Sequence, residues 1–95
     1  PRPVMLAALR SVDGEAHAIL SGEIAEALTQ RFAATSPIYI DVTTEKRYAQ
    51  AGCARLNVRF WQDGVLLPGA STSRRQTMDF GINYCLDGRP PQSLK

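Results

Sequence analysis

Apolar residues recur every three or four positions over residues 13–33, and this spacing predicts a helix with one apolar face. Ser11 and Asp13 are both suited to cap its beginning, and Ser36 followed by Pro37 ends it. Gly22 permits a bend within it. The apolar face consists of Leu20, Ile24, Ala27, Leu28 and Phe32, with Glu23, Glu26 and Gln30 on the opposite side.

After Pro37 the apolar period changes to two, which predicts strands. Residues 38–43, 53–62 and 76–85 each alternate apolar and polar side chains. The apolar positions of these strands are Ile38, Ile40 and Val42 in the first, Ala54, Leu56, Val58 and Phe60 in the second, and Met78, Phe80, Ile82 and Tyr84 in the third. Each predicted strand therefore has one side to bury.

The simplest arrangement of these elements is an α+β fold, α-β-β-β in chain order. The strands of 37–85 form a three-stranded antiparallel meander, and the helix of 13–33 packs on its apolar face. We expect a single domain over 1–95, with 1–12 as an N-terminal extension and 86–95 as an exposed tail. The extension has two interpretations: a mature or processed N-terminus, or a short strand or tail lying on the core.

Length and composition agree with one small folded domain. The chain has 95 residues, of which 44% are hydrophobic, 21% charged and 7% aromatic, as in ordinary globular proteins. The net charge is only +2, so binding to nucleic acid or anionic lipid would require clustered rather than total charge. No apolar run approaches the roughly 20 residues of a transmembrane helix.

The two cysteines predict a cross-strand disulfide. If Cys53 lies opposite Cys85, then Leu56 faces Ile82, Val58 faces Phe80 and Phe60 faces Met78, all apolar pairs. On the other side of the sheet, the same register places Arg59 opposite Asp79 and Arg55 opposite Asn83. A slip of one residue would move every apolar side chain to the wrong face, so the register and the disulfide support each other.

A disulfide that closes this loop stabilises the fold by about 4 kcal/mol on the chain-entropy treatment. Such a bond persists in the periplasm or outside the cell, so we expect a periplasmic or secreted protein. The other interpretation is a pair of buried thiols in a cytosolic protein. Two cysteines and one histidine make a poor zinc site, and we expect no metal and no cofactor.

The polar face of the sheet is the predicted partner-binding surface. Aromatic and arginine side chains are enriched in the energetically dominant parts of protein interfaces. The other interpretation is a face of solvated cross-strand pairs, and a sheet edge is a further place for strand addition by a partner or a second copy. The predicted binding residues are Tyr39, Arg55, Asn57, Arg59, Trp61, Asp79 and Asn83.

Catalytic and nucleic-acid functions are less well supported by the sequence. His17 is the only histidine, the cysteines are assigned to the disulfide, and no serine lies in a nucleophile-elbow motif, so we predict no enzyme. A small hydrolase using His17 is the weakest alternative. Asp41 and Asp79 among the arginines argue against bound oligonucleotide.

The expected function is therefore that of a non-enzymatic extracytoplasmic interaction domain. It binds a protein partner or a second copy of itself, plausibly as an accessory component of a bacterial envelope apparatus of the secretion, conjugation or pilus type. The alternative is a secreted inhibitor or immunity-type protein that acts through the loop of 63–75, which is longer than a connection needs.

Overall fold

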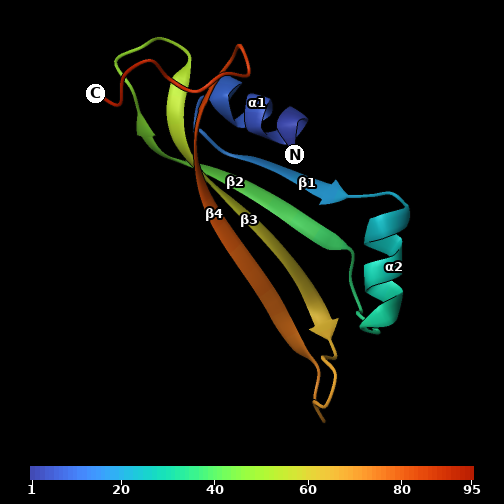
Figure 1. Cartoon of the computed structure of the whole chain (residues 1–95). Coiled ribbons are helices and arrows are strands. Elements are labelled where there is room, and N and C mark those ends of the chain that lie inside the picture. The colour runs from blue at the N-terminus through green and yellow to red at the C-terminus, as the bar shows by residue number, and fades with distance from the viewer.

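The computed structural model describes residues 1–95 and contains two helices and one four-stranded antiparallel sheet (Figure 1). The strands lie side by side in chain order, β1-β2-β3-β4, so the sheet is a meander. The predicted three-stranded sheet therefore lacked one strand. The elements are α1 (Arg2–Arg10), β1 (Ala16–Leu20), α2 (Glu23–Arg31), β2 (Ile38–Arg47), β3 (Cys53–Val65) and β4 (Arg74–Cys85).

The N-terminal segment, predicted as an extension over 1–12, is the helix that covers the sheet. Prolines at the start of α1 suit the first helical turn. Backbone N–H groups in that turn have no acceptor within the helix, so the N–H that proline lacks costs no hydrogen bond. One side of α1 is buried against the strands through Val4, Met5, Ala8 and Leu9. Ala8 is fully buried, which lets the helix approach the sheet closely.

The predicted helix over 13–33 is wrong in its first half. Residues Ala16–Leu20 form β1, which pairs with β2 and adds the fourth strand. Gly14 and Gly22, on either side of β1, both have positive φ angles, and these conformations interrupt a helix at little cost only for glycine. Asp13 is a turn residue rather than a helix cap, because its carboxylate accepts the N–H of Glu15.

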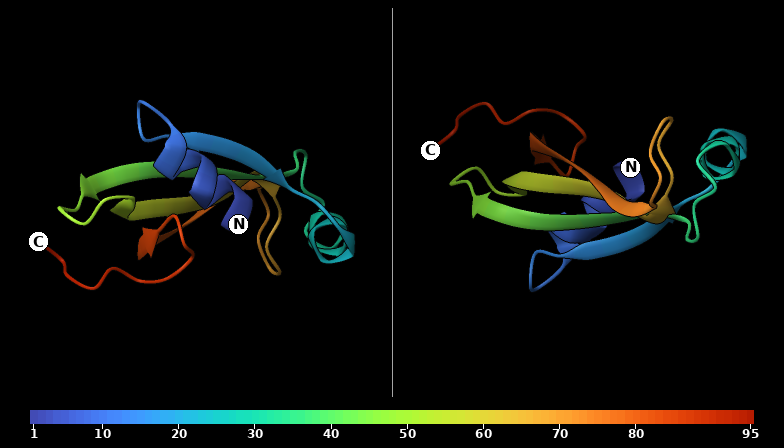
Figure 2. Two further views of the ribbon diagram at one scale, coloured as in Figure 1. Left: turned by 90° about the horizontal axis from the view of Figure 1, so that it is seen from above. Right: turned by 90° about the horizontal axis from the view of Figure 1, so that it is seen from below.

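The remaining helix, α2, does not pack on the sheet face as predicted. It lies beside the ends of β1 and β2, away from α1 in all views (Figures 1 and 2). Its predicted apolar side is largely in solvent, with Ile24 80% and Leu28 40% exposed, and Ala25 is its one buried residue. Hydrogen bonds hold α2 and the segment after it to the end of β3. The buried Gln62 amide donates to Thr29 and to the Ser36 carbonyl, and the Leu66 N–H donates to the Phe32 carbonyl.

The register predicted from the cysteines is confirmed. Cys53 lies opposite Cys85 in a disulfide, and the predicted pairs Leu56–Ile82, Val58–Phe80, Phe60–Met78, Arg59–Asp79 and Arg55–Asn83 are all formed. A bulge between Gln62 and Val65, with Gly64 at positive φ, lets β3 continue past the predicted strand end. The connecting loop is therefore 66–73, shorter than the predicted 63–75.

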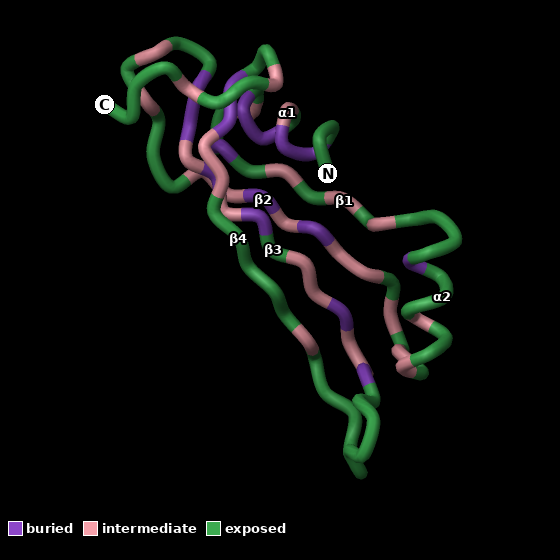
Figure 3. The backbone as a smooth tube through the Cα atoms, viewed as in Figure 1, coloured by how far each residue is buried: buried purple, intermediate pink, exposed green.

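The hydrophobic core lies between α1 and the half of the sheet nearest the disulfide. Val42 and Leu56 are fully buried, with 0% of their surface exposed, and Ile40, Val58 and Tyr84 pack with them. The remaining half of the same sheet face has no helix over it, and Figure 3 shows β4 exposed along most of that length. No helix is long and apolar enough to cross a membrane.

The molecule is elongated, with principal dimensions of 48 × 22 × 21 Å. The strands twist strongly along this length, and α2 and the β3–β4 hairpin lie toward the end opposite the C-terminus (Figures 1 and 2). One face of the sheet carries α1. The other carries the polar side chains of alternate residues, and we call it the open face.

Candidate protein-binding face

The centre of the open face is a hydrogen-bonded group built from three neighbouring strands. The Asp41 carboxylate, on β2, lies between His17 on β1 and Trp61 on β3. His17 Nδ1 is 2.7 Å from Asp41 Oδ1, and the Trp61 indole N–H donates to Asp41 Oδ2 at 2.7 Å. Both carboxylate oxygens are therefore used, and the indole and imidazole rings are fixed in orientation.

An aromatic stack extends from this group toward the β3–β4 hairpin. The rings of Tyr39 and Trp61, directly opposite each other on β2 and β3, have centroids 4.4 Å apart. The Arg75 guanidinium lies over the Trp61 ring at 4.3 Å, within the range of cation–π attraction. Arg75 is itself held by two hydrogen bonds to the carboxylate of Asp63.

On the opposite side of Asp41, the face is hollowed into a small polar pocket of about 230 Å³. Arg59 forms one wall and is held by two hydrogen bonds to Asp79 on β4, at 2.7 and 3.1 Å. No apolar residue lines the pocket. Its walls are His17, Asp41, Thr43, Asn57 and Arg59.

A third polar group lies near the disulfide. The Tyr48 hydroxyl donates to the Asn83 side-chain oxygen at 2.6 Å, and Arg55 approaches the same oxygen at 3.4 Å. The Arg55 guanidinium also fills the space above Gly81, where a Cβ would lie 2.1 Å from Nη2. Because Gly81 has no side chain, the Arg55 guanidinium can lie against the backbone of β4 at this position.

Charge pairing sets the protonation of this face. The hydrogen bond to Asp41 raises the pKa of His17, so the imidazole holds its proton to higher pH than a free histidine. Partial burial alone would raise the pKa of Asp41, but hydrogen bonds from His17 and Trp61 lower it. Similarly, Arg59 lowers the pKa of Asp79 and Arg75 lowers that of Asp63. The carboxylates are ionised at neutral pH.

All seven residues that the sequence indicated for partner binding lie on the open face, distributed over the aromatic stack, the polar pocket with its Arg59–Asp79 pair, and the group near the disulfide. Five further residues contribute to it: His17, Asp41, Thr43, Tyr48 and Arg75. His17 was missed because it was assigned to a helix, and the alternation Ala16, Ala18, Leu20 was the signal for a strand. Arg75 was missed because it was placed in a loop.

The arrangement offers groups suited to recognition. It presents stacked rings, two arginines fixed by carboxylates and an imidazole fixed by Asp41. No three His, Cys, Asp or Glu side chains come together in a way that would hold a metal ion.

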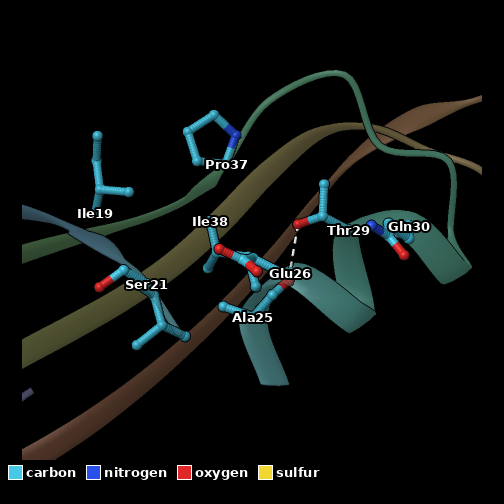
Figure 4. Close-up of a pocket in the computed structure, with 9 residues that line it drawn as sticks. Ile19, Ser21, Ala25, Glu26, Thr29, Gln30, Pro37 and Ile38 are labelled. Carbon is cyan, nitrogen blue, oxygen red and sulfur yellow. Dashed lines mark hydrogen bonds between the residues drawn. The ribbon is translucent and has the colours of Figure 1, made fainter. Parts of the chain in front are cut away.

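A second hollow, of about 390 Å³, lies between α2 and the adjoining ends of β1 and β2 (Figure 4). Ala25, Glu26 and Thr29 of α2 line one side, and Leu20 and Ile38 line the other. Thr29 is occupied by a hydrogen bond to the Ala25 carbonyl, drawn in Figure 4, and Glu26 is the one charged residue of the lining. Few polar groups converge there, so the open face is the stronger candidate.

Comparison of the chain with protein families, curated protein sequences and solved structures found no match. The function is therefore argued from the geometry of the open face.

Proposed function

We propose that the protein is an extracytoplasmic, non-enzymatic interaction domain that binds a protein partner through the open face. The observation that carries this proposal is the aligned Tyr39–Trp61–Arg75 stack on an uncovered sheet face. Tyr, Trp and Arg are the residue types most enriched among the side chains that dominate protein-binding energy. Here the three are adjacent and partly or fully accessible.

The stack is preorganised, which favours binding. Trp61 is held by Asp41 and Arg75 by Asp63, so neither side chain loses much rotational freedom when a partner docks. The polar pocket beside Asp41 supplies directional hydrogen-bonding groups next to these flat surfaces. Such a combination of flat anchors and directional polar groups suits a protein surface.

The disulfide supports an oxidising compartment, so we place the domain in the periplasm or outside the cell. The setting that we propose is an accessory component of a bacterial envelope apparatus. The alternative, an inhibitor acting through the hairpin loop, would use Leu66 and Leu67, which are 40% and 42% exposed.

The test uses a photo-crosslinking residue in place of Thr43, in the polar pocket of the open face, in cells that produce the chain. A matched probe replaces Ile24 on α2. The proposal expects one adduct specific to the Thr43 probe in the envelope fraction. The partner identified from it should then bind purified Trp61→Ala and Arg59→Ala at least about tenfold more weakly than the unaltered chain, a loss of about 1.4 kcal/mol or more.

Leu66→Ala is the control for the loop, and circular dichroism verifies that each variant is folded. Unaltered affinity in both open-face variants would overturn the proposal. A loss confined to Leu66→Ala would support the inhibitor in its place.

A further inference from the structure

Of the two edge strands of the sheet, β4 is long and has backbone groups free to pair with another strand. It has 12 residues, pairs only with β3, and is exposed over nearly all of 74–81. Proteins usually protect such an edge with proline, a bulge, a covering loop or an inward-pointing charge, because free backbone groups recruit another strand. Between Gln76 and Tyr84, β4 has no proline and no register shift.

The backbone groups that face outward belong to the odd-numbered residues. Hydrogen-bonded and non-hydrogen-bonded pairs alternate along an antiparallel ladder. The Leu86 N–H donates to the Gly52 carbonyl of the segment before β3, whereas the Cys85 N–H points away from β3 and donates to the Arg89 carbonyl. The Cα atoms of Cys53 and Cys85 are only 4.0 Å apart, as in a non-hydrogen-bonded pair. Alternation then directs the N–H and C=O groups of Thr77, Asp79, Gly81 and Asn83 away from β3.

Exposed apolar side chains lie along the same edge. Met78 and Phe80 are 59% and 48% exposed on the face that carries α1, because α1 covers only the half nearer the disulfide. Phe80 is supported from one side by an edge-to-face contact with Phe60 at 5.4 Å. Its other side has no neighbouring strand.

We propose that β4 pairs antiparallel with β4 of a second copy, about a two-fold axis through Phe80. This register pairs both the exposed apolar side chains and the free backbone groups of the edge. Phe80 faces Phe80, and Met78 faces Ile82 of the other copy, so all the apolar side chains of the edge meet on one face. The outward backbone groups meet as hydrogen-bonded pairs of Asp79 with Gly81 and of Thr77 with Asn83.

Charge complementarity supports the same register. Asp79 of one copy faces Gly81 of the other, and the Arg55 guanidinium lies over Gly81. Each Asp79 carboxylate, held on one side by its own Arg59, thus gains a second arginine across the interface. If the axis passed through Asp79 instead, two carboxylates would face each other, and like charges directly opposite are destabilising.

The pairing has a natural limit. Beyond Tyr84 the outward backbone groups of Cys85 are already hydrogen-bonded: its N–H donates to the Arg89 carbonyl, and its carbonyl accepts the Gly88 N–H. The second strand therefore spans Gln76 to Tyr84, and the two sheets join into one continuous sheet with two copies of the open face.

Cysteine cross-linking tests the register. Phe80→Cys places two thiols in a non-hydrogen-bonded pair, with Cα atoms about 4.5 Å apart, within disulfide reach. Met78→Cys is the matched control on the same face, because its two copies are four residues out of register, about 13 Å apart. We expect a covalent dimer from Phe80→Cys in mild oxidant and none from Met78→Cys. The double variant Met78→Cys/Ile82→Cys, which keeps Phe80, should also cross-link.

Sedimentation equilibrium of the unaltered chain should show a dimer at about 100 µM, where even a weak dimer is populated. Phe80→Lys should weaken it at least about tenfold, because it places two like charges at the axis. Ile24→Lys, at an exposed apolar residue of α2 away from the edge, should leave it unchanged. A monomeric wild-type chain, or cross-linking through Met78→Cys alone, would overturn the proposal. Neither result bears on partner binding by the open face.

Discussion

The two ends of the elongated sheet are built differently. At the disulfide end, α1 covers the strands, Val42 and Leu56 are fully buried, and Cys53 is bonded to Cys85. At the hairpin end, no helix covers the corresponding face, and Phe80 is half exposed. Both ends share the same continuous strands, so backbone pairing is similar and side-chain burial is the main difference.

This contrast separates stability from recognition. Apolar burial contributes most of the stability of a small domain, and only 16 of the 95 residues are buried, most of them at the disulfide end. The exposed edge residues and the aromatic stack belong to the hairpin end. A surface that is open to solvent, as the proposed binding face is, cannot also be part of a packed core.

The largest expected effect comes from removal of the disulfide. Cys53→Ala/Cys85→Ala should lower the free energy of unfolding by about 4 kcal/mol, because the loop between the cysteines is no longer closed in the unfolded chain. Urea denaturation with and without a reducing agent measures the change. The reduced unaltered chain is the control and should behave as the double variant does. A loss below about 1 kcal/mol would contradict the assignment of stability to this end.

Matched leucine substitutions sharpen the comparison directly. Leu56→Ala, in the packed core, should destabilise the fold by about 3 kcal/mol, because it leaves a cavity that the neighbouring strands cannot fill. Leu28→Ala removes the same atoms from α2, where the side chain is 40% exposed, and should cost less than about 1 kcal/mol. Equal losses in chemical denaturation would show that α2 is packed as tightly as the core.

The smallest expected effect concerns His17 and its pH dependence. Because the folded-state pKa of His17 is raised, its contribution to stability is complete below the ordinary value of about 6.5 and is lost as pH rises through the folded value. The lowered pKa of Asp41 adds a second loss as pH falls through the acid range. NMR titration of the imidazole should give a pKa above that in Asp41→Asn. Identical titration curves would exclude the pairing.

The strand register could be predicted because two independent patterns agreed. The alternation of apolar residues in β3 and β4 set which side each residue faces, and the cysteines set which residues lie opposite each other. Six of the seven predicted residues of the open face lie on these two strands, and Tyr39 followed from the alternation of residues 38–43. Local pattern was sufficient here because each of these strands has one buried and one exposed side.

The N-terminal half could not be predicted in the same way. Residues 16–20 fit both a helical period and the alternation of a strand. Pairing with β2, a tertiary effect, decides between the two. Val4, Met5, Ala8 and Leu9 are helically spaced, but the run is short and proline-flanked, and its burial depends on strands that follow much later. His17 was misplaced for the same reason.

The chain-order meander has a consequence for how the protein folds. Every strand pairs with its neighbour along the chain, so the sheet has no crossover and its pairings are close in sequence, which favours fast folding. The helix α1 precedes all of these strands, yet it packs on β2, β3 and Tyr84. Nine residues are too few to form a stable helix alone, so α1 depends on the assembled strands to stay helical, and one core joins both ends of the chain.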